Sequence, residues 1–254
     1  YNVNPSCTLR LSQTVTCSGT LTGVLNGPMA WEGTINVVAA NPATFNFTGG
    51  NSVNWNYGTF SGGGVLTNKS KLLLTTAANK GFSGSVINNE GAITLEDSGS
   101  LYFTNATLNN KASGLINLSS NAAGITYTSS TLQVINNYGL IKKSIQNGTT
   151  SILVNVNNYN LIDASLGVMK FDGSLTNAQT GTVIGIATLD LPSPANFSNN
   201  GTFAPGGTPG VLTVIGDYKS TATSILAVDL NGLTSGTQYD VLAIQGDAIM
   251  DGSV

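Results

Sequence analysis

The sequence predicts an all-β chain folded as a right-handed parallel β-helix, a β-solenoid with coils of about 20–27 residues. Composition is the first observation, because charged residues make up only 8% of the 254 while Gly, Asn, Thr and Ser are abundant. The second observation is that short runs of Val, Ile and Leu recur between these turn formers, as expected of many short strands. The third observation is a repeated motif with a period in the twenties, which is typical of one coil per repeat.

The repeated motif is an apolar pair, then Asn or Asn-Asn, a short spacer, Gly and a second apolar run; its clearest copy runs from Val134 to Ile141. Six copies carry the Asn and Gly positions Asn88 and Gly91, Asn109 and Gly114, Asn136 and Gly139, Asn157 and Asn160, Asn177 and Gly181, and Asn199 and Gly201. The Asn markers lie 21, 27, 21, 20 and 22 positions apart, and a weaker copy at Asn68 precedes the first by 20. Leucine-rich repeats share this period, but the chain lacks their fixed leucine spacing. The parallel β-helix is therefore favoured.

We expect the Asn and Gly of each copy to form a corner of the coil. Gly supplies a positive φ without steric cost, and Asn160 replaces it in one copy, as the residue that best tolerates the left-handed region after Gly. Asn side chains at equivalent corners could stack into an amide ladder. They could equally act only as turn formers, and the sequence leaves both interpretations open.

Three segments are expected along the chain. Residues 1–40 would form an N-terminal cap or irregular first coils, 41–206 the solenoid repeats, and 207–254 further coils of a chain that is expected to continue. Cys7 and Cys17 lie ten positions apart, which favours a disulfide that staples the cap in an oxidising compartment. The alternative is two unlinked cysteines, because spacing does not establish contact.

The last part of the chain carries a second pattern. Ala204-Pro205-Gly206-Gly207-Thr208-Pro209-Gly210 precedes a short strand, Gly216-Asp217-Tyr218 and the run Tyr239-Asp240-Val241-Leu242-Ala243-Ile244-Gln245-Gly246. From about Thr202 to Gly252 the chain resembles the last coils of autotransporter-like and other bacterial adhesin-like β-solenoids. The resemblance implies an exported structural or adhesive protein, extracellular or at the cell surface. Its partners would be a host or environmental surface, a glycan, or further copies of itself in a filament.

Composition also bears on chemistry. The chain has no histidine, which excludes Ser-His-Asp and Cys-His catalysis, and the only adjacent carboxylates are Glu96 and Asp97. We therefore expect no catalytic residues, no cofactor and no metal site. A carbohydrate-binding or polysaccharide-degrading β-helix remains the alternative. A net charge of −3 gives no basic footprint for nucleic acid, and no apolar run is long enough to insert into a membrane.

Four aromatic residues could contact a glycan. Trp55 and Tyr57 lie in the early, irregular part, and Tyr138 and Tyr159 occupy equivalent positions of two successive repeats. That equivalence predicts that Tyr138 and Tyr159 lie on one edge of the rod, one coil apart. They could also be ordinary corner residues, because a sugar platform is recognised by depth and clustering that sequence does not show.

Overall fold

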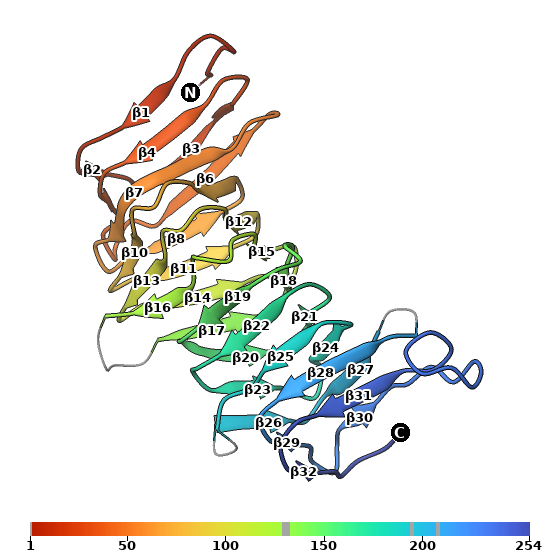
Figure 1. Ribbon diagram of the computed structural model, residues 1–254. Helices are drawn as coiled ribbons and strands as arrows, with labels where there is room; N and C mark the ends of the chain where they lie inside the picture. The colour runs from red at the N-terminus through yellow and green to blue at the C-terminus, as the bar shows by residue number, and fades with distance from the viewer. Residues whose placement is uncertain (1, 129–132, 194–195, 207–208) are drawn as a thin grey trace.

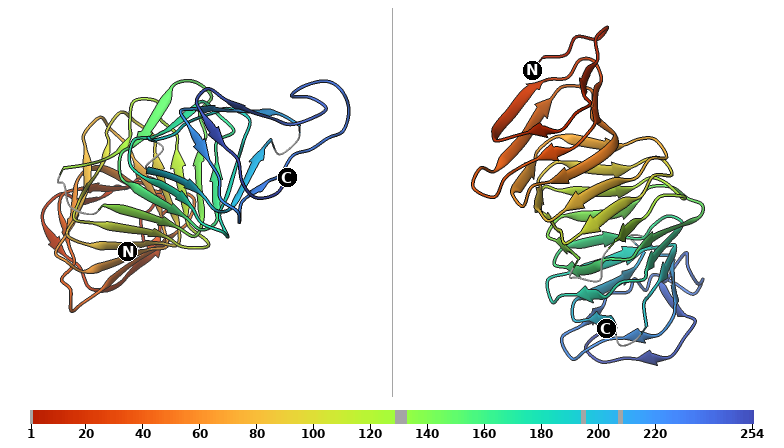
Figure 2. Two further views of the ribbon diagram at one scale, coloured as in Figure 1. Left: turned by 90° about the horizontal axis from the view of Figure 1, so that it is seen from below. Right: turned by 90° about the vertical axis from the view of Figure 1, so that its left-hand side faces the viewer.

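The computed structural model describes residues 2–128, 133–193, 196–206 and 209–254, and it is a parallel β-solenoid of about ten coils. Each complete coil contributes one strand to each of three faces, which we call face 1, face 2 and face 3 in chain order (Figure 1). The two termini lie at opposite ends of the rod, and the stacked strands twist along it (Figure 2). The fold class predicted from the motif period is confirmed.

The strands are short because each coil must turn three times. Face 1 contains β1 (Leu9–Leu11), β4 (Met29–Glu32), β9 (Lys71–Leu74), β12 (Ala92–Leu95), β15 (Leu115–Leu118), β18 (Leu140–Lys143), β21 (Leu161–Asp163), β24 (Thr182–Gly185), β27 (Thr202–Pro205) and β30 (Ile225–Leu226). Face 2 contains β2 (Val15–Thr16), β5 (Ile35–Asn36), β10 (Lys80–Ser83), β13 (Leu101–Thr104), β16 (Ile125–Tyr127), β19 (Thr149–Ile152), β22 (Val168–Phe171), β25 (Thr188–Asp190), β28 (Val211–Ile215) and β31 (Val241–Ile244). The long strand β7 (Val53–Ser61) pairs on both faces and joins them into one 21-stranded sheet.

Face 3 is a separate nine-stranded sheet. It contains β3 (Gly19–Val24), β6 (Ala43–Thr48), β8 (Val65–Asn68), β11 (Val86–Asn89), β14 (Thr107–Asn110), β17 (Val134–Asn137), β20 (Asn155–Asn158), β23 (Leu175–Asn177) and β26 (Phe197–Asn199). The pair β29 (Tyr218–Lys219) and β32 (Ala248–Ile249) extends this face through a bridge between Asn199 and Ser220. The motif repeats are therefore the strands of face 3 followed by a turn into face 1.

The core is a set of columns that run along the rod. In most strands successive residues point alternately inward and outward, so every second side chain is buried. On face 3 the inward column includes Ile87, Leu108 and Ile135, all fully buried and in register. Because each coil packs only on its neighbours, stability is distributed over the coil interfaces.

Large aromatic rings fill the core of the N-terminal coils. The rings of Trp31 and Trp55 stack with centroids 4.0 Å apart and planes 2° apart. Both are fully buried, and Phe82 continues the cluster toward Phe103. Trp55 is thus a core residue, and its expected role as a glycan contact is wrong.

The N-terminal residues show where parallel pairing begins and how the two cysteines lie. Strands β1 to β5 of residues 1–40 already pair in parallel with later coils, so the solenoid begins early in the chain. Cys7 and Cys17 are free, so the predicted disulfide is wrong. The reason is packing: Cys17 points into the hydrophobic core while Cys7 is exposed before β1, and burial raises the pKa of the Cys17 thiol.

The turns between face 3 and face 1, which we call the Asn corner, have an unexpected backbone. Gly91, Gly114, Gly139, Gly181 and Gly201 are absent from the described glycines with positive φ, as Asn160 is from the other residues that have it. The expected left-handed conformation is wrong at these positions. Instead the glycines make room, because a Cβ on Gly139 would lie 2.3 Å from the carbonyl oxygens of Gly114 and Lys111.

True left-handed residues occur at the corner between face 2 and face 3. Gly84 has a φ of 63° and Asn105, in the equivalent position one coil later, has a φ of 50°. Here Gly and Asn do replace each other for the expected reason. Of the Pro-Gly run near the end, Gly207 and Thr208 lie outside the described residues, while Gly206 has a φ of 92°.

Candidate functional site

A ladder of asparagine side chains runs inside the Asn corner along most of the rod. Each amide donates from Nδ2 to the Oδ1 of the next coil at 2.7–2.8 Å. All members are fully buried. The inner ladder, as we call it, consists of Asn68, Asn89, Asn110, Asn137, Asn158, Asn177 and Asn199.

Each rung of the inner ladder is satisfied on both atoms. Nδ2 of Asn137 donates to Oδ1 of Asn158 at 2.7 Å and to the carbonyl of Leu161 at 3.0 Å. Its Oδ1 accepts from Nδ2 of Asn110 at 2.8 Å and from the backbone amide of Gly139 at 3.3 Å. These backbone partners fix the orientation of each amide, and a buried amide is tolerated because it is paired in this way.

The inner ladder is closed differently at its two ends. At the first rung, Oδ1 of Asn68 accepts from the backbone amide of Ser70 at 3.0 Å, and Phe45 takes the equivalent position one coil earlier. At the last rung, Nδ2 of Asn199 donates to the hydroxyl of Tyr218 at 2.9 Å. Tyr218 is buried, which raises its pKa to about 12, although the bond from Asn199 acts in the opposite direction. An aromatic residue therefore stands at each end.

A second ladder runs on the outer surface of face 3. Nδ2 of Asn109 donates to Oδ1 of Asn88, and Asn136 and Asn157 continue the series, each bond being 3.0 Å long. This outer ladder is only partly buried, and it donates toward the N-terminal end, opposite to the inner ladder. Thr176 and Ser198 replace Asn in the coils beyond Asn157.

The two ladders revise the alignment of the repeats. The strand register pairs Asn158 with Asn177 and Asn89 with Asn68. In the two copies with a single Asn, Asn68 and Asn177, that residue is the inward one. When the first Asn of each copy is used as the marker, the spacings from Asn68 to Asn88 and from Asn157 to Asn177 are therefore each wrong by one residue. Along the inner ladder the spacings are 21, 21, 27, 21, 19 and 22 residues.

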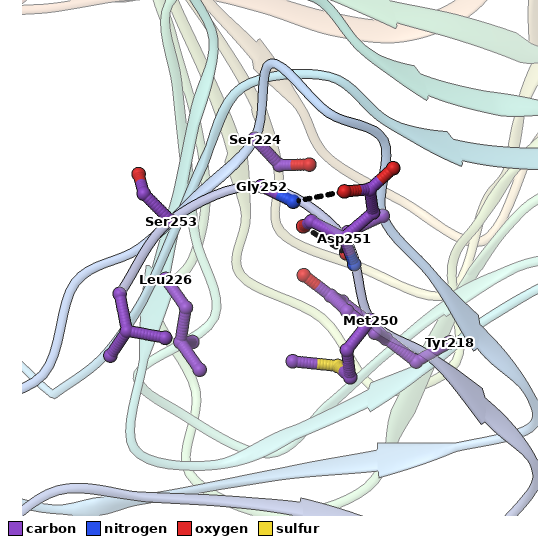
Figure 3. Close-up of a pocket in the computed structure, with 9 residues that line it drawn as sticks. Tyr218, Ser224, Leu226, Met250, Asp251, Gly252 and Ser253 are labelled. Carbon is purple, nitrogen blue, oxygen red and sulfur yellow. Dashed lines mark hydrogen bonds between the residues drawn. The ribbon is translucent and has the colours of Figure 1, made fainter.

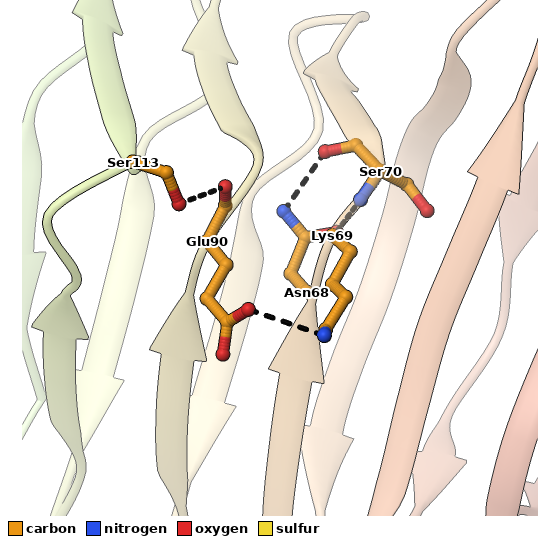
Figure 4. Close-up of polar contacts among 5 residues, drawn as sticks. All are labelled: Asn68, Lys69, Ser70, Glu90 and Ser113. Atoms are coloured by element: carbon orange, nitrogen blue, oxygen red, sulfur yellow. Dashed lines mark hydrogen bonds and ion pairs between the residues drawn. The ribbon is translucent and has the colours of Figure 1, made fainter.

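A ridge of exposed and half-buried side chains follows the Asn corner outside the inner ladder. It comprises Lys69, Glu90, Lys111, Tyr138 and Tyr159, one from each successive coil, and we call it the corner ridge. The Nζ of Lys69 lies 3.3 Å from a carboxylate oxygen of Glu90 (Figure 4). The hydroxyl of Ser113 donates to the backbone carbonyl of Glu90 at 2.8 Å and ties the next turn to the ridge.

Two tyrosines form the C-terminal half of the corner ridge. The rings of Tyr138 and Tyr159 stack with centroids 4.7 Å apart and planes 7° apart, and the residues are 43% and 36% exposed. The Nζ of Lys111 lies 6.0 Å from the Tyr138 centroid, on the same column. The expected position of the two tyrosines on one edge is therefore found. Tyr57 is also exposed, but it lies on β7 in the N-terminal coils.

Two buried lysines lie at the corner between face 1 and face 2. Nζ of Lys80 donates to the carbonyl of Thr76 at 2.8 Å, and burial lowers its pKa to about 8, with Asp97 acting in the opposite direction. Nζ of Lys143 donates to the hydroxyl of Thr150 at 2.8 Å and to Oδ1 of Asn121 at 3.1 Å. Burial lowers the pKa of Lys143 as well. Both ammonium groups hold the chain at a turn.

The C-terminal end contains a cavity of about 110 Å³ between the last coils (Figure 3). Tyr218, Leu226 and Met250 line it, and Asp251 is its single carboxylate. Within the described residues, no three or more His, Cys, Asp or Glu side chains gather as a metal site would require. The cavity therefore offers an apolar recess and no acid/base pair.

Several of these features are not predicted by the sequence analysis above. At Asn89, Asn110, Asn137 and Asn158 the second Asn of each pair is the buried rung, which the register of the single Asn68 and Asn177 indicates. In the last copy the rung is the first Asn of the pair, Asn199. Lys80 and Lys143 occupy inward positions of alternating strands, which is the signal that could have identified them as buried. No sequence pattern marks Tyr218 in this way, because its role depends on the hydrogen bond from Asn199 in the preceding coil.

In the described part of the chain, no helix is long and apolar enough to cross a membrane. Comparison with protein-family models, with curated proteins and with solved structures finds no match to this chain.

Proposed function

We propose that the chain is a structural or adhesive rod, exported to the cell surface or beyond. Its coils would hold an extended contact surface for a host or environmental surface, a glycan or further copies of itself. The observation that carries the proposal is the inner ladder, which links seven successive coils through buried amide bonds. A continuous, hydrogen-bonded spine suits a molecule that must keep its shape along its length.

Two further features support this proposal. The resemblance of the last coils to bacterial adhesin-like solenoids agrees with an exported surface protein. The surface chemistry also agrees with it. The outward positions of face 3 include side-chain amides of Asn and hydroxyls of Thr in register, a pattern suited to repeated polar contacts. Nucleic acid and membrane insertion are not among the proposed partners, and no catalytic role is proposed.

A carbohydrate-binding β-helix is the second candidate, and the stacked Tyr138 and Tyr159 favour it. A polysaccharide-degrading enzyme has less support, because Glu96 and Asp97 do not form an acid/base pair: the Asp97 carboxylate is occupied by the Ser98 backbone amide, which lowers its pKa. Appreciable turnover of polyuronides or plant and algal glycans by the purified chain would overturn the proposed function.

The exposed thiol of Cys7 offers a direct test. Because Cys17 is buried, maleimide beads would couple at Cys7 and present every rod from its N-terminal end. We expect such beads to stay attached, under flow, to at least one of epithelial cells, plant cell-wall films and immobilised polysaccharide. Beads with albumin serve as the control. Equal detachment of both bead types from all three surfaces would contradict an adhesive role.

A further inference from the structure

We propose that the corner ridge binds an acidic oligosaccharide, with a sugar ring against Tyr159 and a carboxylate on Lys111. This inference rests on the proposed adhesive function and names its ligand class. Three properties of the ridge carry it: an aromatic surface, a positive charge without a carboxylate partner, and a row of amides beside both.

Among the described residues, the Tyr159 ring has a stacked ring on one face only. Tyr138 covers one face of the Tyr159 ring, as their stacking shows. The next residue of the column is Ala178, whose backbone amide bonds to Asn158 just as that of Tyr159 bonds to Asn137. Alanine has only a methyl group, so no described ring continues the stack above Tyr159. The apolar face of a pyranose can take the place of that missing ring.

The charge lies at the other end of the stack. Glu90 is paired with Lys69 at 3.3 Å, and Lys111 forms no ion pair among the described residues. A sugar stacked beyond Tyr159 lies at the level of Ala178, three coil steps from Lys111, or roughly 14 Å at about 4.8 Å per coil. One sugar cannot reach both, so the ligand must be an oligosaccharide that lies along the rod axis.

The amides provide the polar contacts that sugar hydroxyls need. Asn136 and Asn157 of the outer ladder stand two positions before Tyr138 and Tyr159, so both kinds of side chain face outward. Asn157 is the last rung of the outer ladder, since Thr176 follows it. Hydroxyls, a carboxylate and apolar ring faces are the three groups that an acidic sugar chain presents together.

The test is calorimetric titration of the chain with hexagalacturonate, with maltohexaose as the neutral control and hexaglutamate as the control for charge alone. We expect hexagalacturonate to bind more tightly than both, and galacturonate monomer to bind weakly. Tyr159→Ala and Lys111→Gln should each weaken binding by about tenfold. The matched controls Tyr127→Ala and Lys142→Gln change an exposed tyrosine and a lysine on other faces and should leave affinity within about twofold.

Ala178→Tyr separates binding from folding. A third ring would extend the stack and occupy the sugar position, so affinity should fall about tenfold while the melting temperature stays constant or rises. Unchanged affinity in Ala178→Tyr, or equal binding of hexaglutamate, would overturn the inference. If Cys7-coupled beads adhere but no hexagalacturonate binds, this inference fails and the adhesive function stands. If neither occurs, both fail.

Discussion

The side-chain amide of Asn199 donates to the hydroxyl of Tyr218 at 2.9 Å, and this bond ends the inner ladder. On β29 the register partner of Asn199 is Ser220, so Tyr218 continues the column of Phe197 and its hydroxyl reaches across to the end of the ladder. Its ring packs on Phe197 and Phe203, so the polar ladder passes into an aromatic cluster without leaving an unpaired amide. The last rung is thus satisfied by a residue that also closes the core.

Replacing Tyr218 by Phe should destabilise the chain by about 1–2 kcal/mol at neutral pH, because Nδ2 of Asn199 loses a buried acceptor. The pKa of Tyr218 is raised from 10 to about 12, so the folded chain keeps a proton that the unfolded chain releases. Wild-type stability should therefore fall between pH 10 and 12, more steeply than that of the variant. Urea unfolding across this range would show it, and parallel curves for the two proteins would contradict it.

Asn137→Ala should cost about 1–3 kcal/mol, because it leaves the amides of Asn110 and Asn158 without their partner in a buried site. Asn136→Ala is the matched control on the neighbouring, partly exposed position. It should cost about 0.5–1 kcal/mol. Chemical denaturation measures both, and a larger effect at Asn136 would mean that the outer ladder is the stabilising one.

Lys80 provides a second pH test of opposite sign. Burial lowers its pKa from 10.5 to about 8, so between these values the unfolded chain binds more protons than the folded one. Stability should therefore rise as pH increases from about 8 to 10.5, and this rise should be absent in Lys80→Met. Melting temperatures of both proteins over this range test it. A wild-type curve that runs parallel to that of Lys80→Met would place the ammonium in solvent.

Gly139→Ala should destabilise the chain by about 1–3 kcal/mol, since its Cβ would meet the carbonyl oxygens of Gly114 and Lys111. Gly50→Ala is the control, because nothing lies within 4 Å of a Cβ there and its φ is not positive. That change should be neutral or slightly stabilising. Hydrogen exchange should show the damage at Gly139 spreading to the adjoining coils only. Equal melting temperatures for the two variants would show that the Asn corner has room.

The period of the motif was enough to predict the solenoid, because one repeat per coil follows from spacing alone. The sequence could not distinguish an amide ladder from simple turns, because the answer depends on which Asn of each pair points inward. The single Asn68 and Asn177 carry that information, but only once their register with Asn89 and Asn158 is known.

Two local predictions failed for a shared reason. Gly139 was expected to need a positive φ, and Cys17 was expected to reach Cys7, both from properties of neighbouring residues in the chain. In the structure Gly139 is set by the backbone of the coil below, and Cys17 by the core that it enters. Contacts between coils, about twenty residues apart, decide both positions.

Hydrogen exchange of asparagine side-chain amides measures the inner ladder directly. In a chain labelled with ¹⁵N-asparagine, NMR after transfer to D₂O should show seven slowly exchanging Nδ2 groups, belonging to Asn68, Asn89, Asn110, Asn137, Asn158, Asn177 and Asn199. The outer-ladder amides and those of exposed turns should exchange much faster. If all asparagine side chains exchanged at the fast rate while the backbone of face 3 stayed protected, the solenoid would be stable without a hydrogen-bonded inner ladder, contrary to the role assigned to it.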